Sequence, residues 1–248
     1  MGKYSKLLVA ITTVAMIVIN ALANILPYNN LSTAAISDMF KVFFVPAGYV
    51  FAIWGVIYLG ILAYAFYQSI TNKPVLEEVA PFIIIGNIAN SVWIFTWHWL
   101  LIPFTLPLML ILLVSLIKTY LVLKNSKDLN PLFTTVPFGI YLGWISVATI
   151  ANVTDLLDFV GVKSLVFSGQ TWAALLILIA GVFGTIFIRR YKEVTYPLVI
   201  VWAVIGIAVK FPQEMYINLA AIAVVAVLII QIVLLSISRL GLRFSMRK

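Results

Sequence analysis

Long apolar runs constrain the fold of this chain more than any other feature. A transmembrane helix needs about 20 mostly apolar residues to cross the hydrocarbon core. The composition agrees with a membrane location, because 64% of the residues are hydrophobic and 10% are charged. We therefore expect an all-α integral membrane protein, an eight-helix transmembrane bundle. The runs occupy residues 7–26, 46–68, 80–101, 103–124, 133–152, 171–188, 195–211 and 216–238.

The basic residues predict the orientation of this bundle. With eight spans, 13 of the 16 Lys and Arg residues fall on the side of the two termini, and the other three are Lys41, Lys163 and Lys210. Cytoplasmic loops carry the excess of Lys and Arg. The sequence therefore predicts a multi-pass protein of the cell membrane with both termini cytoplasmic. The membrane we expect is a bacterial plasma membrane.

The first span has an alternative interpretation. Lys3 and Lys6 precede an apolar stretch that ends in Ala21-Leu22-Ala23, as in a signal peptide with its small-residue cleavage site. Cleavage would leave seven spans with the same orientation. Asn20 and Asn24 share one helical face, which is unusual in a segment that is removed.

The polar residues leave little room for enzymatic chemistry. The chain has no Cys and a single His, His98, which excludes thiolate sites and a multi-histidine metal site within one chain. All eight acidic residues fall in loops or at the ends of spans. We therefore predict no catalytic and no metal-ligating residues, and an enzyme is the less favoured class. The net charge of +8 reports membrane orientation, so we expect no nucleic-acid partner.

Three spans carry stripes of aromatic and polar residues at helical spacing. The stripes are Phe51, Trp54 and Tyr58; Asn87, Asn90, Trp93 and Trp97; and Tyr141, Trp144, Ala148 and Asn152. Such stripes can simply pack helix against helix. Alternatively, rigid aromatics with a few polar groups can line a cavity for a flat, amphipathic molecule.

These motifs resemble the tryptophan-rich sensory protein / translocator protein (TspO/MBR) family. The family's second helix carries a proline, then F-x-x-W-x-x-x-Y and a glycine, and its third carries N-x-x-W. Its fifth helix carries P-Y-x-x-W and a later F-A-x-x-L-N; here only the proline, tryptophan, alanine and asparagine positions correspond, with a longer spacing between proline and tryptophan. The matching residues are Pro46, Phe51, Trp54, Tyr58, Gly60, Asn90, Trp93, Pro137, Trp144, Ala148 and Asn152.

The resemblance implies a five-helix core over residues 1–155, whose first loop, with Phe43 and Phe44, covers a ligand cavity. Residues 156–248 would then form a second part, with three additional helices and a basic cytoplasmic tail. The ligand-binding residues implied between the first, second, third and fifth helices are Trp54, Tyr58, Asn90, Trp93, Trp97, Trp144, Ala148 and Asn152.

The function implied by the resemblance is that of a membrane receptor or sensor. Its ligand would be a porphyrin or another haem-like tetrapyrrole, or a lipid or sterol, with no cofactor required. A small-molecule permease or exporter is the alternative, and a light-dependent porphyrin-degrading activity is a third. The expected partners are membrane lipid and a small hydrophobic ligand. A homodimer is also possible, with Gly181, Gly184 and Gly206 as surfaces for close approach.

Overall fold

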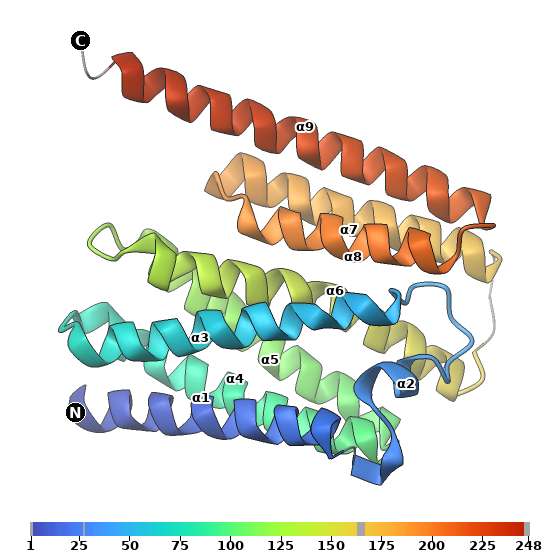
Figure 1. Ribbon diagram of the computed structural model, residues 1–248, viewed down its shortest axis with the longest axis horizontal. Helices are drawn as coiled ribbons and strands as arrows, with labels where there is room; N and C mark the ends of the chain where they lie inside the picture. The colour runs from blue at the N-terminus through green and yellow to red at the C-terminus, as the bar shows by residue number, and fades with distance from the viewer. Residues whose placement is uncertain (1, 27, 163–166, 246–248) are drawn as a thin grey trace. The chain divides into compact units, whose positions relative to one another are not determined.

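The computed structural model describes residues 2–26, 28–162 and 167–245 (Figure 1). Three basic residues that entered the orientation argument, Lys163, Arg247 and Lys248, lie outside the described residues. The side chains of Lys3 and Arg243 lie outside them as well. Every regular element within the described ranges is helical.

The helices follow the apolar runs closely. The long helices are α1 (Gly2–Ile25), α3 (Ile53–Ile70), α4 (Pro74–His98), α5 (Ile102–Asn125), α6 (Thr135–Phe159), α7 (Gly169–Tyr191), α8 (Thr195–Lys210) and α9 (Met215–Ser245). A short helix, α2 (Thr33–Ser37), lies in the first loop, and a 3-10 turn (Gly48–Ala52) leads into α3.

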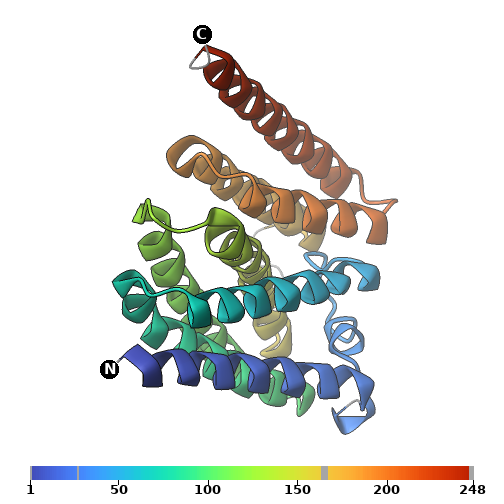
Figure 2. The same cartoon turned by 60° about the vertical axis from the view of Figure 1, so that its left-hand side comes forward.

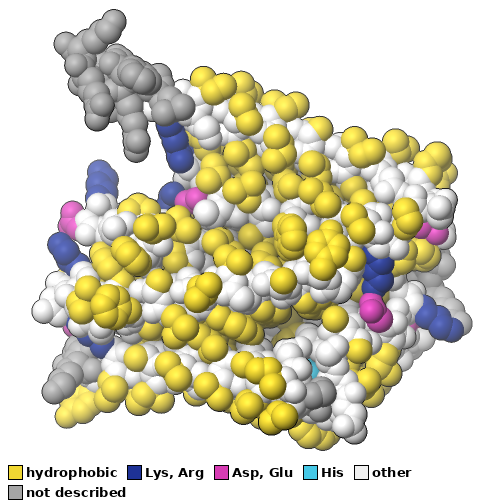
Figure 3. All heavy atoms as spheres, viewed as in Figure 1, with side chains coloured by type: hydrophobic (Ala, Val, Ile, Leu, Met, Phe, Trp, Pro, Cys, Tyr) yellow, Lys and Arg dark blue, Asp and Glu magenta, His cyan; other side chains and the backbone are white. Residues whose placement is uncertain are grey.

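The all-α membrane fold is confirmed. Within the described ranges, seven helices are long and apolar enough to cross a membrane. The remaining predicted span, α8, has 16 residues, a length of about 24 Å, short of the roughly 30 Å hydrocarbon core. Figure 3 shows hydrophobic side chains along the flanks of the helices and charged ones toward their ends.

The first of two compact units comprises Met1–Val42 and Phe51–Lys163. Its long helices form a closed ring in which α1 packs on α3, α3 on α6, α6 on α5, α5 on α4 and α4 on α1. Figure 2 shows the same arrangement from a second direction. The ring surrounds a core that contains several fully buried aromatic side chains, Tyr64, Tyr120, Tyr141 and Phe138.

The second compact unit comprises Phe43–Val50 and Ser164–Lys248. In it α7, α8 and α9 each pack against the other two. The segment Phe43–Val50 packs on α8: the Ala47 amide donates to the Gly206 carbonyl at 3.1 Å, and Trp202 Nε1 donates to the Val50 carbonyl at 3.1 Å. The sequence-based division at residues 155 and 156 stays a prediction about domains.

The three glycines proposed as surfaces for a second copy of the chain have partners inside it. A Cβ at Gly181 would lie 2.7 Å from Val224, and one at Gly184 would lie 2.9 Å from Leu228. A Cβ at Gly206 would lie 2.2 Å from Cγ2 of Val50. The close approach that these glycines permit is therefore used within the second unit, and a homodimer stays a prediction.

Candidate functional site

An aromatic cluster joins the start of α3 to the middle of α6. Trp54 stacks on Tyr58 with ring centroids 5.5 Å apart. Its ring also meets Tyr141 edge-to-face at 5.9 Å and Trp144 at 6.3 Å, with an interplanar angle of 83° to Trp144. Phe51 contacts the same Trp144 ring at 5.7 Å. The structure thus brings together three predicted site residues, Trp54, Tyr58 and Trp144.

Within this aromatic cluster the polar edge of Trp144 is unusual. The side chain is 3% exposed, yet its Nε1 atom has no hydrogen-bond partner among the described residues. A buried indole N–H normally finds an acceptor, and leaving such a donor unpaired costs about 1–3 kcal/mol. The cluster therefore holds one donor that an acceptor on a ligand can satisfy.

Beneath the cluster, buried amides connect α1, α4 and α6. Asn20 Nδ2 donates to Asn90 Oδ1 at 2.7 Å, and Asn90 Nδ2 donates to the Tyr141 hydroxyl at 2.8 Å. That hydroxyl in turn points at Met16 Sδ, 3.7 Å away. Asn90 is fully buried and satisfied by protein groups, so its present role is to tie helices together.

A second group of predicted site residues lies nearer the C-terminal end of α4. Trp93 and Trp97 stack with ring centroids 5.5 Å apart. Trp93 Nε1 donates to Asn152 Oδ1 at 3.4 Å, and Trp97 Nε1 donates to the Thr33 carbonyl at 3.2 Å. Thr33 begins α2, so this group fixes the short loop helix to α4. The predicted residues therefore fall into two groups: one contacts α6 at Trp144, and the other contacts it at Asn152.

His98 is held at the end of α4 by contacts through both ring nitrogens. Nδ1 lies 3.2 Å from the Tyr28 carbonyl, and Nε2 lies 3.1 Å from Thr33 Oγ1. Tyr28 also packs edge-to-face against the ring, with centroids 5.8 Å apart. These contacts give His98 a structural role in closing the loop over α4.

The other predicted residues lie in different surroundings. Ala148 is half-buried on α6, on the stripe that also carries Trp144 and Asn152. Phe43 and Phe44, the expected lid, belong to the second unit. There Phe43 contacts Phe211 with ring centroids 5.1 Å apart, and Phe44 is buried. Their role as a lid stays a prediction.

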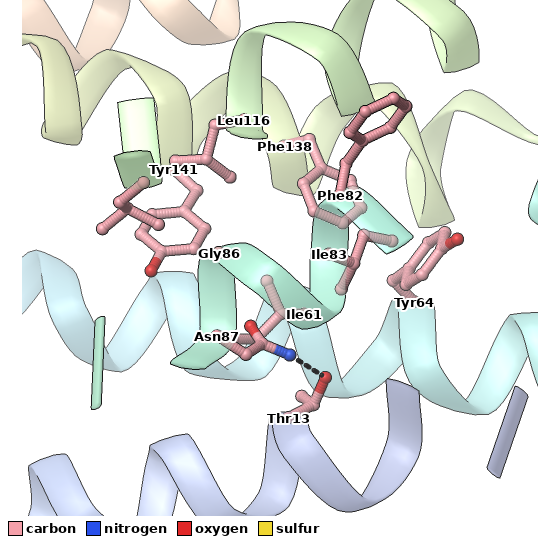
Figure 4. A pocket seen from close by; sticks show the side chains of 11 residues that line it. Thr13, Ile61, Tyr64, Phe82, Ile83, Gly86, Asn87, Leu116, Phe138 and Tyr141 are labelled. Carbon is pink, nitrogen blue, oxygen red and sulfur yellow. Dashed lines mark hydrogen bonds between the residues drawn. The ribbon is translucent and has the colours of Figure 1, made fainter. Parts of the chain in front are cut away.

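The first unit contains a small internal cavity between its helices. Tyr64, Phe138, Gly86 and Tyr141 line it, and Asn87 at its edge donates to Thr13 Oγ1 at 3.0 Å (Figure 4). Its volume of about 10 Å³ is room for about one water, whereas pockets for small molecules measure about 300–1,000 Å³.

The cavity is therefore too small for a flat ligand, and the geometry of Trp54 and Trp144 likewise leaves no space for one. A flat ligand between two rings needs them parallel and about 7 Å apart, since each carbon contact takes about 3.5 Å. Here the rings are nearly perpendicular at 6.3 Å. The aromatic groups and the unpaired indole N–H suit a flat amphipathic ligand, but the space for one opens only if a ring moves.

Three residues that organise the site were not among the predicted site residues. Tyr141 shares the stripe of Trp144, and its spacing could have identified it. Asn20 was recognised as unusual, but nothing in the sequence indicates that it pairs with Asn90, 70 positions away. Thr33 lies in a polar-leaning loop, where no periodic pattern marks a buried contact.

Comparison with known proteins identifies a family. The family model described as TSPO-like protein matches residues 6–234. This range includes α7, α8 and most of α9, so the C-terminal helices fall within the matched family pattern. Searches of curated proteins and of solved structures returned no match.

Proposed function

The chain belongs to the TSPO-like protein family, and we propose that its first unit binds a flat, amphipathic ligand at the aromatic cluster of α3 and α6. The observation that supports this most is the buried, unpaired Nε1 of Trp144. A ligand carbonyl, carboxylate or ring nitrogen that accepts from it would remove the cost of the unpaired donor.

Entry of the ligand requires movement of one aromatic ring. Trp54 is half-buried, as are Phe51 and Tyr58, whereas Trp144 and Tyr141 are buried. Of the three half-buried rings we take Trp54 as the one that moves, because it contacts both Tyr141 and Trp144. Rotation of Trp54 away from Trp144 would open a slot that still has Trp144 and Phe51 as its walls. Ala148 is half-buried and lies one turn further along α6. Its side chain is a single methyl group, so a flat molecule can lie against the helix there.

The ligand class follows from the walls of this slot. Aromatic rings favour a flat apolar body, and the single indole donor orients one polar edge. A tetrapyrrole has both properties, so protoporphyrin IX is the first probe to use. We further propose that the protein lies in the cell membrane with both termini cytoplasmic, on the strength of the basic residues clustered at that side.

The test is a titration of protoporphyrin IX into protein in lipid nanodiscs, followed by the fractional quenching of tryptophan fluorescence. We expect saturable quenching. Trp144→Phe keeps an aromatic ring but removes the N–H, and it should weaken binding by about 2- to 10-fold, the value of one hydrogen bond. Trp172→Phe is the matched control, because it also removes one tryptophan but lies on α7 of the second unit.

The outcomes separate the alternatives. Equal affinities for Trp144→Phe and Trp172→Phe would refute the assignment of the site. Quenching that rises linearly without saturation would indicate partition of the porphyrin into lipid. In that case the permease becomes the favoured function, and flux into proteoliposomes is the next measurement.

A further inference from the structure

A groove lies between α7 and α9 on the second unit. Its volume is about 460 Å³, and its walls are almost wholly apolar. Leu178, Val182 and Ile186 form the α7 side, and Val224 and Val227 form the α9 side. Val182 and Val227 are both exposed, so the groove opens to the outside of the helix pair.

The glycines of α7 explain how the groove forms. Gly181 and Gly184 allow Val224 and Leu228 of α9 to approach within contact distance. The contacting pairs advance in the same direction along both helices, and directly after them Gln231 Nε2 donates to Thr185 Oγ1 at 3.3 Å. The two helices are therefore parallel, and their close contact forms the floor of a groove that follows the helix axes.

One end of the groove is basic. Arg189 and Arg190 line it in the last turn of α7, and both are exposed. Within the described part of the chain, no carboxylate forms an ion pair with either. The nearby acidic residue, Glu193, accepts bonds from the amides of Val194 and Thr195. The Arg239 side chain donates to the Lys192 carbonyl at the same end and adds positive charge.

The length of the groove matches one leaflet of a bilayer. Leu178 and Arg189 both line it, and the eleven-residue step from one position to the other rises by about 17 Å. One leaflet contributes about 15 Å of hydrocarbon. An acyl chain in the groove would therefore place its headgroup at the arginines, and Thr185, one turn earlier, would lie at the depth of the ester groups.

We propose that this groove binds one anionic phospholipid of the leaflet that faces the basic ends of the helices. One acyl chain lies along the walls of the groove, and the phosphate accepts hydrogen bonds from Arg189 and Arg190. Guanidinium groups bind phosphate oxygens with charge-assisted and often bidentate hydrogen bonds. The site uses only residues of the second unit and does not depend on the ligand proposed for the first.

Headgroup recognition can be tested by native mass spectrometry of delipidated protein in detergent. Phosphatidylglycerol and phosphatidylcholine with identical acyl chains are the probes. We expect one phosphatidylglycerol per chain to bind more tightly than phosphatidylcholine. The double variant Arg189→Gln/Arg190→Gln should lower the affinity for phosphatidylglycerol about 25-fold, since each basic side chain near an anionic lipid contributes a factor of about five.

The control variant Lys118→Gln/Lys127→Gln removes the same charge from exposed positions of the first unit and should leave the affinity unchanged. Equal affinity for the two lipids would overturn the proposal, as would an equal loss in both double variants.

Occupation of the groove by the acyl chain needs a separate variant. Ala223 is exposed and lines the groove, so Ala223→Phe fills the groove without disturbing the glycine contacts. It should abolish the tightly held lipid while the protein keeps its helical circular dichroism and its elution volume. Retention of the lipid in Ala223→Phe would refute the acyl-chain site. A dimer that dissociates in Ala223→Phe would refute it too, because a second copy of the chain would then be the occupant.

Discussion

Replacing Gly206 by alanine should loosen the packing of the Phe43–Val50 segment on α8. The new Cβ would lie 2.2 Å from Val50 Cγ2 and 3.3 Å from Pro46 Cβ, where carbon atoms normally keep about 3.5–4.0 Å. Valine is stiff about χ1, and the Pro46 contact limits movement on the other side. The segment must therefore shift away from the helix.

The size of the effect follows from the cost of overpacking. Inserting a methyl group into a well-packed contact costs about 1–3 kcal/mol. The cost falls on the closed state of the segment, so its local opening should become about 5- to 150-fold more frequent. The amide of Ala47 reports this opening directly, because it donates to the carbonyl of Gly206 itself.

The assay is hydrogen–deuterium exchange of the peptide that contains Ala47, measured in nanodiscs. Gly55→Ala is the matched control: it makes the same change within a helix, but a Cβ there meets nothing within 4 Å. We expect faster exchange at Ala47 in Gly206→Ala and unchanged exchange in Gly55→Ala. An unchanged rate in Gly206→Ala would refute the steric argument, and an equal acceleration in both variants would show that the effect is not local.

Two further variants test the contacts that hold the first unit together. Asn90→Ala removes hydrogen bonds to two other helices and should lower the free energy of unfolding by about 1–2 kcal/mol. Ser91→Ala loses only a bond within its own helix and should change it by less than about 0.5 kcal/mol; similar denaturation midpoints for the two variants would contradict this. Trp97→Phe removes the donor to the Thr33 carbonyl and should speed exchange in α2. Trp99→Phe, at an exposed ring, should not, so protection of α2 that survives in Trp97→Phe would argue against this anchor.

The helices could be predicted from sequence because membrane insertion imposes a simple rule. Each apolar run of sufficient length corresponds to a helix, and even the separation of α4 from α5 by a few residues near Pro103 was visible in the sequence. The run 195–211 also forms a helix, α8, but this helix is shorter than the seven that are long enough to cross a membrane. The short helix α2 was not predicted, because its five residues show no amphipathic period and are fixed by Trp97 and His98.

The candidate site was predictable in part. Trp54, Tyr58 and Trp144 meet because each lies on an aromatic stripe, and stripes on neighbouring helices face a common core. The pairing of Asn20 with Asn90 depends on which helices become neighbours, and no periodicity encodes that. The same limit applies to Phe43: its loop position suggested a lid, whereas its contact with Phe211 depends on helices more than 100 residues later.

The membership of Phe43–Val50 in the second unit has a consequence for biosynthesis. Ala47 leaves the ribosome about 160 residues before its partner Gly206. At about 5–20 residues per second, the segment waits roughly 8–30 s for α8 to be made. During that interval the helices of the first unit can insert and close their ring, while the segment Phe43–Val50 lacks its contacts with α8. Docking of this segment is therefore a late, long-range step, and a chain truncated before α8 should retain the ring, with α2 held on α4, but leave Phe43–Val50 open to proteases.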